Sequence, residues 1–198
     1  KEMSVRYGED SSAFFVRVLG EFPKIDDETI ISLSLVEDAQ AREITMSEYT
    51  PRIWGLDIAR FGTDSSVLAE RQGTVITKIE VWKGKDLMQL TGLVHSKYNN
   101  LGPSEQPIEI MVDSIGLGAG VLDRLKELGL PARGINVSES PSMRGQYINL
   151  RAELWFRMKE FLEARDCKLP KDESLFSELV SPRYSFSSTG KLKVESKQ

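Results

Sequence analysis

The sequence has little of what several common classes of enzyme need. Its 198 residues include one cysteine, Cys167, and one histidine, His95. A single cysteine excludes an intramolecular disulfide framework and a zinc site built from cysteines. A Ser-His-Asp triad would have to use His95, and the G-x-S-x-G motif that accompanies many such triads is missing. Any catalytic chemistry in this chain is therefore expected to rest mainly on carboxylates.

Other absences concern phosphate binding and membranes. The G-x-x-x-x-G-K-[ST] motif of P-loop ATPases does not occur, and no apolar stretch approaches the roughly 20 residues that a bilayer span needs.

The net charge of −4 argues against a basic coat over the whole surface. The charge is uneven, because residues 1–50 carry 5 Lys and Arg against 11 Asp and Glu, whereas residues 181–198 carry 4 against 1. Only one face is therefore expected to favour a polyanion.

The hydrophobic pattern alternates between strands and helices over most of the chain. The predicted strands are 53–58, 66–71, 74–82, 108–113 and 132–137; the predicted helices are 34–42 (with Ser34 as N-cap), 86–98, 116–128, 149–164 and 172–180; a hairpin follows at 184–194. Three strands that can pair antiparallel, then helix, strand, helix, strand and helix, is the element order of the ribonuclease H-like fold. The sequence thus predicts an α/β fold with a mixed central sheet flanked by helices, in which the first and fourth strands are neighbours.

Two aspartates stand out because they belong to apolar strands. Asp57 falls inside the first strand, where an unpaired carboxylate would be costly, and Asp113 ends the fourth. If these strands are neighbours, the carboxylates meet at one end of the sheet, where like charges need a cation or a shared proton. Carboxylate oxygens suit Mg²⁺ or Mn²⁺, and Asp64 could reach the same ion across a glycine turn. The alternative is that Asp57 and Asp113 only cap turns.

Several basic residues are candidates for contacts with the phosphates of a polyanion. They are Arg60, Arg144, Lys191 and Lys193. Lys191 and Lys193 share one face of the final strand, and a solvated hairpin is the alternative interpretation for them. Such contacts need no metal and are expected to weaken steeply with salt.

Three further features have mainly structural interpretations. The stretch Gly116-x-Gly118-x-Gly120 lacks the G-x-G-x-x-G spacing of a dinucleotide fingerprint and is interpreted as a site of close helix packing. His95 is expected at the surface of its helix. Cys167 is expected to be a buried structural thiol.

Four segments, in this order, resemble the large terminase subunit of tailed bacteriophages, the motor that packages DNA into procapsids. The resemblance extends over nearly the whole chain. The segments are 17–23 (RVLGEFP), similar to the connection between the ATPase and nuclease domains of that family; 54–66 (WGLDIARFGTDSS), similar to its first nuclease strand and turn; 112–121 (VDSIGLGAGV), similar to its second acidic motif; and 149–155 (NLRAELW), similar to the helix that follows.

The resemblance implies a divalent-metal-dependent endonuclease that cuts concatemeric viral double-stranded DNA during genome packaging. Asp57 and Asp113 would be the catalytic metal ligands, with Asp64 assisting, and two Mg²⁺ or Mn²⁺ ions would act in the active complex. Residues 1–50 would be an acidic linker from a preceding ATPase domain, and residues 51–198 the nuclease domain.

The same resemblance implies partners and a place of action. The partners would be double-stranded DNA, the ATPase domain of the same subunit, the small terminase subunit and the portal or procapsid, with no membrane, in the cytoplasm of the host cell. The family also has a third catalytic aspartate after the last hairpin. We expect this acid to lie beyond Gln198, and the 198-residue chain to hold metal weakly and to be nearly inactive.

Two other functions remain open at this stage. Actin- and sugar-kinase-like ATPases share the fold and also have an acidic first strand followed by a polar phosphate turn, but their second phosphate motif and second lobe are missing here. A non-catalytic module that docks the packaging motor is the other alternative, since a fold does not determine a function.

Overall fold

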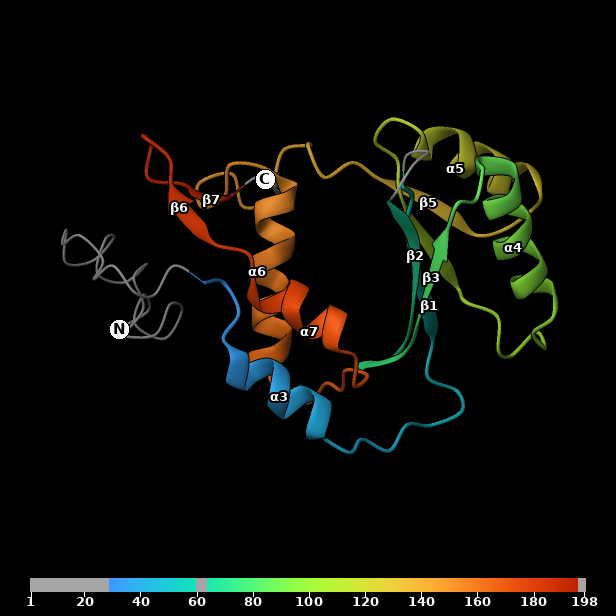
Figure 1. The fold of residues 1–198 in the computed structure, drawn as a ribbon, viewed down its shortest axis with the longest axis horizontal. Coiled ribbons are helices and arrows are strands. Elements are labelled where there is room, and N and C mark those ends of the chain that lie inside the picture. The colour runs from blue at the N-terminus through green and yellow to red at the C-terminus, as the bar shows by residue number, and fades with distance from the viewer. Residues whose placement is uncertain (1–28, 60–63, 196–198) are drawn as a thin grey trace.

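Five strands form one mixed sheet at the centre of the molecule (Figure 1). The structure is a computed structural model that describes residues 29–59 and 64–195. The strand order is β3-β2-β1-β4-β5. β1 (Arg52–Asp57) is central, antiparallel to β2 (Ser65–Gln72) and parallel to β4 (Glu109–Asp113). The predicted ribonuclease H-like α/β fold is thereby confirmed, including the neighbouring first and fourth strands.

Two outer strands complete this sheet, and a small second sheet lies apart from it. β3 (Val75–Lys83) pairs antiparallel with β2, and β5 (Ala132–Ile135) pairs in parallel with β4. β6 (Tyr184–Phe186) and β7 (Leu192–Val194) form the predicted hairpin.

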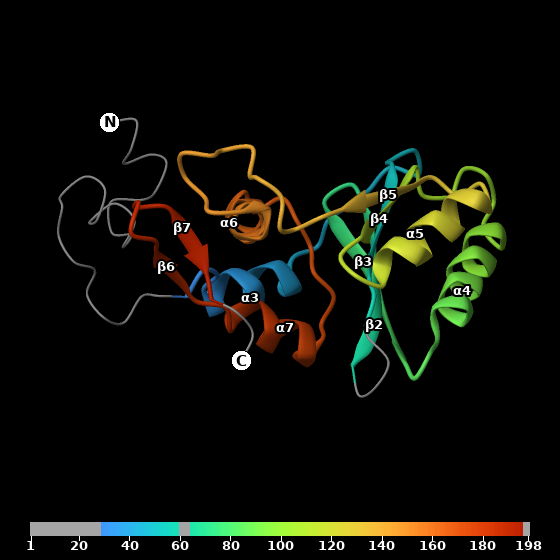
Figure 2. The same ribbon diagram turned by 90° about the horizontal axis from the view of Figure 1, so that it is seen from above.

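Helices lie on both sides of the central sheet. α4 (Leu87–Asn99) and α5 (Gly118–Glu127) cover one face, whereas α3 (Leu33–Ala41), α6 (Leu150–Glu163) and α7 (Glu173–Val180) gather with the β6-β7 hairpin on the other side (Figures 1 and 2). No helix in the described part of the chain is long and apolar enough to cross a membrane.

Each of these two groups of elements has its own apolar core. The first core lies between the sheet and α4 and α5, and the second joins α3, α6, α7 and the hairpin. The fully buried side chains of the first include Trp54, Leu68, Leu90, Val94, Ile110, Val112, Val121 and Leu125, and those of the second include Ile30, Ile31, Val36, Tyr147, Leu162, Leu169 and Leu192.

The helix starts follow from local capping chemistry. Asp86 accepts a hydrogen bond from the backbone N–H of Gln89, whose side chain accepts one in return from the backbone of Asp86, so α4 begins with a capping box. Asn149 and Asp172 are the N-caps of α6 and α7, and each side chain accepts a hydrogen bond from the backbone N–H three residues on. These caps agree with the predicted starts of the three helices.

Two predicted helix starts were wrong, by one residue for α3 and by two residues for α5. α3 begins at Leu33, with Ser32 rather than Ser34 as its N-cap residue. α5 begins at Gly118 rather than Gly116, because Gly116 has a φ of +64°, which belongs to a turn and not to a right-handed helix. The strand predicted as 132–137 ends earlier, at Ile135, where its pairing with β4 stops.

The described part of the predicted acidic linker, residues 29–50, contributes to the second core. The backbone N–H of Ile30 donates to the carbonyl of Pro182 (3.1 Å), and the N–H of Leu169 donates to the carbonyl of Ala39 (3.1 Å). Residues 29–41 therefore contribute a helix to the same core as α6 and α7. The domain boundary near residue 50 stays a prediction.

Candidate functional site

Asp57 and Asp113 lie side by side at the carboxyl ends of the two central strands. Leu56 of β1 is in register with Val112 of β4 in a parallel pair, and each is followed directly by one of the aspartates. Neighbouring strands are about 4.8 Å apart, and residues in register point to the same face. Leu56 and Val112 face the first core, so the two carboxyl groups point to the opposite face. Asp57 is exposed and Asp113 half-buried.

The turn after β4 holds the carboxyl group of Asp113 in place. Its Oδ1 accepts a hydrogen bond from the backbone N–H of Ile115 (3.1 Å), and the N–H of Ser114 donates to the carbonyl of Ile135 (3.0 Å). Gly118 is packed against the same turn: a Cβ atom there would lie 1.7 Å from the carbonyl oxygen of Asp113. The glycine of this position therefore permits close packing of α5 on the candidate site, as the sequence predicts.

The segment after Asp57 is held by the neighbouring strand. The backbone N–H of Ala59 donates to Oγ of Ser66, a buried residue of β2 (3.1 Å). Asp64 is exposed and precedes β2, three residues before Val67, the partner of Asp57. At about 3.3 Å per residue, the backbone of Asp64 lies on the order of 10 Å beyond Val67 along the strand direction. Asp64 is thus at the rim and is not brought next to the pair.

The two adjacent carboxylates suit a hard divalent cation. Mg²⁺ is typically bound through one or two carboxylates, with waters and substrate phosphates completing its coordination. Within the described ranges, no group of three or more histidine, cysteine, aspartate or glutamate side chains is placed to hold a metal ion. Asp57 and Asp113 can accordingly supply two protein ligands, and their roles as ligands and catalytic residues stay predictions.

The phosphate-binding candidates that the structure describes lie on a different part of the molecule from the two aspartates. Arg144 and Lys193 are exposed and Lys191 is half-buried, whereas Arg60 lies outside the described residues. The loop that carries Arg144 pairs with β7: the N–H of Leu192 donates to the carbonyl of Gln146 (2.8 Å). The loop that carries Arg144 therefore lies against the hairpin that carries Lys191 and Lys193, although Arg144 precedes Lys191 by 47 positions in the sequence.

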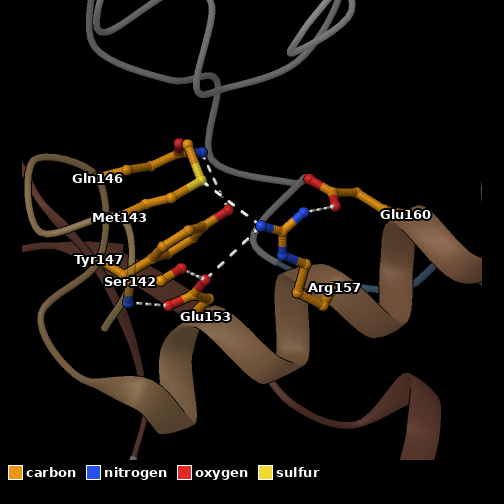
Figure 3. Close-up of polar contacts among 7 residues, drawn as sticks. All are labelled: Ser142, Met143, Gln146, Tyr147, Glu153, Arg157 and Glu160. Carbon is orange, nitrogen blue, oxygen red and sulfur yellow. Dashed lines mark hydrogen bonds and ion pairs between the residues drawn. The ribbon is translucent and has the colours of Figure 1, made fainter. Parts of the chain in front are cut away.

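Glu153, on α6, is an important residue that the sequence analysis missed. Its side chain is 4% exposed and accepts hydrogen bonds from both the backbone N–H (2.6 Å) and the hydroxyl of Ser142 (Figure 3). Arg157, one turn later, lies 3.7 Å from the carboxylate. Burial opposes ionisation, but the bonds from Ser142 and Met143 and the charge of Arg157 outweigh it and hold the pKa of Glu153 below its usual range.

A signal for Glu153 exists in the sequence. It is an acid four residues after the N-cap Asn149, on the side of the helix that also carries the apolar Phe156. An acid in the first turn of a helix is also common for electrostatic reasons. Only the fold shows that a loop approaches this turn and bonds to the carboxylate.

A second polar cluster lies under the sheet face that carries α4. Nζ of Lys97 is 2.9 Å from Glu70 and 2.7 Å from Glu80, and it lies 5.7 Å from the ring centroid of Trp54. Burial alone would lower the pKa of Lys97, but the two carboxylates outweigh it and raise that pKa. The three charges join α4 to β2 and β3 and have no part in the carboxylate pair.

His95 and Cys167 have the structural roles that the sequence predicts. His95 is half-buried on α4 and lies 2.9 Å from the side chain of Asn99. Cys167 is fully buried, its Sγ donates to the carbonyl of Phe161 (3.2 Å), and burial raises its pKa. A buried thiol with a raised pKa is a poor nucleophile.

A cavity of about 140 Å³ lies at the opposite end of β1 from Asp57. Arg52, Trp54 and Glu105 are among the residues that line it. Ligand pockets for molecules of nucleotide size are typically about 300–1,000 Å³. This cavity is too small for a nucleotide and does not include the aspartates.

Known structures resemble this fold closely. The nuclease domain of the large terminase subunit gp2 of bacterial virus Sf6 superposes with a TM-score of 0.70 at 20% identity, over 85% of this chain and 88% of that domain. A variant of the Sf6 domain was solved with manganese. The large terminase nuclease of thermophilic phage G20c, solved with magnesium, superposes with a TM-score of 0.60 at 16% identity, over 87% of this chain and 89% of that one.

The chain has the fold of a terminase nuclease domain. The resemblance predicted from the sequence is confirmed in this respect. At the level of sequence, a probable terminase large subunit of Enterobacteria phage P7 is 24% identical over 96% of this chain. The chain spans 41% of the length of that relative. No protein-family model matches the chain.

Proposed function

We propose that this chain is a divalent-metal-dependent nuclease domain that hydrolyses phosphodiester bonds of viral double-stranded DNA during genome packaging. The observation that carries the proposal is the register of β1 and β4, which places Asp57 and Asp113 side by side. The likeness to terminase nuclease domains, of which two were solved with manganese or magnesium, supports it.

Asp57 and Asp113 would hold Mg²⁺ or Mn²⁺ in this proposal, with Asp64 assisting from the rim. A bound pair of such ions supplies positive charge that activates a water and stabilises the leaving oxygen of a phosphodiester. The protein's own contribution is positioning: two like charges on adjacent strands repel until a cation neutralises them. The N–H of Ile115 fixes the rotation of the Asp113 carboxyl group.

The basic residues on the loop and hairpin would bind the DNA backbone. Arg144, Lys191 and Lys193 can neutralise phosphates without reading bases, which suits an enzyme that must grip duplex DNA of any sequence. Arg60 is included in the proposal because it follows the Asp57 strand directly in the sequence.

The proposed place of the chain in the whole protein follows the family resemblance. Residues 1–50 would connect an ATPase domain of the same subunit to the nuclease domain of residues 51–198. The small terminase subunit and the portal or procapsid would be further partners, and the site of action would be the cytoplasm of the host cell. The relative from phage P7, a probable large subunit, supports this placement.

The alternative of an actin- or sugar-kinase-like ATPase has less support. Its second phosphate motif is missing from the sequence, and the cavity at Arg52 and Trp54 lies away from the two aspartates. A docking module without catalysis is tested by the experiments below, because such a module has no need of a metal site.

Metal binding tests the site directly. We would titrate Mn²⁺ into the protein and follow water-proton relaxation, comparing the wild type with Asp57→Asn and Asp113→Asn. Changes to residues that only support a ligand already cost about 10–100-fold in metal affinity, so loss of a ligand should cost at least as much. Asp123→Asn, which changes an exposed carboxylate on α5, is the matched control and should bind as the wild type does. Equal affinity in all four proteins would exclude the proposed site.

Cleavage tests the reaction. Supercoiled plasmid would be incubated with each protein and Mn²⁺, and nicked and linear products measured over time. The wild type and Asp123→Asn should cut slowly, because two carboxylates hold Mn²⁺ only weakly, whereas Asp57→Asn and Asp113→Asn should not cut. Metal binding without cleavage by any of the proteins would favour the docking module instead.

A further inference from the structure

The buried carboxylate of Glu153 is the anchor for the loop that carries Arg144. Its two oxygens accept from different groups of Ser142: Oε2 from the backbone N–H and Oε1 from the hydroxyl (Figure 3). The backbone of Met143 also hydrogen-bonds to this carboxylate. Consecutive N–H groups that converge on one charged acceptor fix the local backbone more strongly than neutral bonds do.

From this anchor, a chain of backbone hydrogen bonds leads to the hairpin. The carbonyl of Met143 accepts from the N–H groups of Gln146 (2.9 Å) and Tyr147 (3.2 Å), which closes a turn with Arg144 at its exposed side. The carbonyl of Gln146 then accepts from the N–H of Leu192 (2.8 Å). Residues 146–148 thus extend the hairpin at β7, as the pairing of Tyr147 with Leu192 also shows.

Aromatic packing within the second core supports the same arrangement. The ring of Tyr147, 1% exposed, lies 5.5 Å from that of Phe156 on α6, which lies 5.5 Å from Tyr184 on β6. The loop, α6 and the hairpin are therefore one packed unit. Lys191 and Lys193 flank Leu192, the residue to which the loop is bonded.

We infer that Glu153 is a positioning residue that holds Arg144 beside Lys191 and Lys193, so that the three cations form one surface for the phosphates of duplex DNA. Glu153 is buried and does not touch DNA itself; it acts through Ser142 and the turn at Met143. The inference rests on the proposed function, because it takes the loop and the hairpin as the DNA-binding surface.

Arg157 and Glu160 allow a control that separates this role from general electrostatics. Arg157 lies near Glu153 but bonds more closely to Glu160, at 3.0 Å, on the exposed side of α6. Glu160→Gln removes a carboxylate from the same ion network without changing any bond to Ser142. It should leave DNA binding as it is in the wild type.

The experiment is a double-mutant cycle on DNA binding. The affinity of the full chain for a short fluorescent DNA duplex would be measured by anisotropy over a series of salt concentrations, without divalent metal. Arg144→Ala should reduce the magnitude of the slope of log K against log salt by about 0.9, the value for one phosphate contact. Glu153→Gln should lower it by a similar amount, and adding Arg144→Ala to Glu153→Gln should change nothing more.

Lys193→Ala provides the readout that a merely structural role would not give. Lys193 is on β7 itself, so Lys193→Ala should reduce the salt dependence of DNA binding by the same amount in the wild-type and Glu153→Gln backgrounds. General destabilisation would weaken the Arg144 and Lys193 contributions alike. If Glu153→Gln does not fold by circular dichroism, Ser142→Ala replaces it in the same cycle, with the same expected coupling to Arg144 and not to Lys193.

The outcomes separate this inference from the proposed function. Salt-dependent binding by the wild type, with additive effects of Glu153→Gln and Arg144→Ala, overturns the role of Glu153 alone. A wild type whose binding does not depend on salt overturns the DNA-binding surface, and the role of Glu153 with it. Non-additive effects of Glu153→Gln and Arg144→Ala, together with additive effects of Glu153→Gln and Lys193→Ala, support both the role of Glu153 and the DNA-binding surface.

Discussion

Asp57 and Asp113 each follow one member of a registered pair, Leu56 and Val112, on two parallel strands. Their carboxyl groups therefore share one face and one end of the sheet, although 55 residues of sequence lie between the two strand ends. Two like charges in this arrangement repel each other in the absence of a cation. This repulsion has a measurable effect on stability.

Asp57→Asn should leave the melting temperature of the metal-free protein unchanged or raise it, because one of the two crowded charges is removed. Mn²⁺ should raise the melting temperature of the wild type but not of Asp57→Asn, since only a ligand that binds the folded state stabilises it. Thermal melts by circular dichroism, with and without Mn²⁺, measure both. A large loss of stability in the metal-free variant would show instead that Asp57 is a structural cap.

Gly118→Ala should destabilise the protein by about 3 kcal/mol or more, because the added Cβ would overlap the carbonyl oxygen of Asp113 and the backbone must move. The matched control is Gly120→Ala in the same helix. Its added Cβ meets no atom within 4 Å, and it should stabilise by about 0.5–1 kcal/mol through helix propensity. Urea unfolding of the two variants measures the difference; equal stabilities would mean that the turn at Asp113 is not packed as described.

Lys97→Met should destabilise the protein by about 2 kcal/mol or more, because it leaves Glu70 and Glu80 close together without their shared cation. Lys78→Met is the control. It removes an ion pair with the same Glu80, but Lys78 is 59% exposed, and such surface pairs contribute about 0–1 kcal/mol. Urea unfolding at neutral pH measures both variants, and a loss for Lys78→Met as large as that for Lys97→Met would contradict the expected difference.

The contribution of Glu153 to stability should depend on pH. Its pKa in the folded protein lies below the ordinary value of 4.5, so folding favours the ionised form. The stabilisation is fully present above the unfolded pKa and is lost as the pH falls through the folded pKa. The difference in unfolding free energy between wild type and Glu153→Gln should therefore shrink as the pH is lowered below about 4.5. Glu160→Gln, measured in parallel by urea unfolding from pH 7 to pH 3, should show a much smaller change, because Glu160 is 53% exposed.

The sequence by itself determined the elements and their order. Apolar periodicity located each strand and helix, and polar residues such as Asp86 and Asn149 marked the helix starts, because capping is a local interaction between a side chain and the N–H groups of the next turn. The same pattern singled out Asp57 and Asp113, since a charge within or at the end of an apolar strand is unusual. Where a local rule failed, as at Gly116, the backbone had adopted a positive φ that a glycine permits but does not require.

Only the tertiary structure decided which of these residues meet. The register that aligns Leu56 with Val112 depends on packing of the sheet against α4 and α5, and it leaves Asp64 at the rim. The loop at Ser142 reaches Glu153 because the second core folds residues 141–148 onto α6 and β7. Sequence patterns report on neighbours within a turn or a strand. Contacts between residues distant in the chain are determined by the side-chain volumes and hydrogen bonds that the whole fold must satisfy at once.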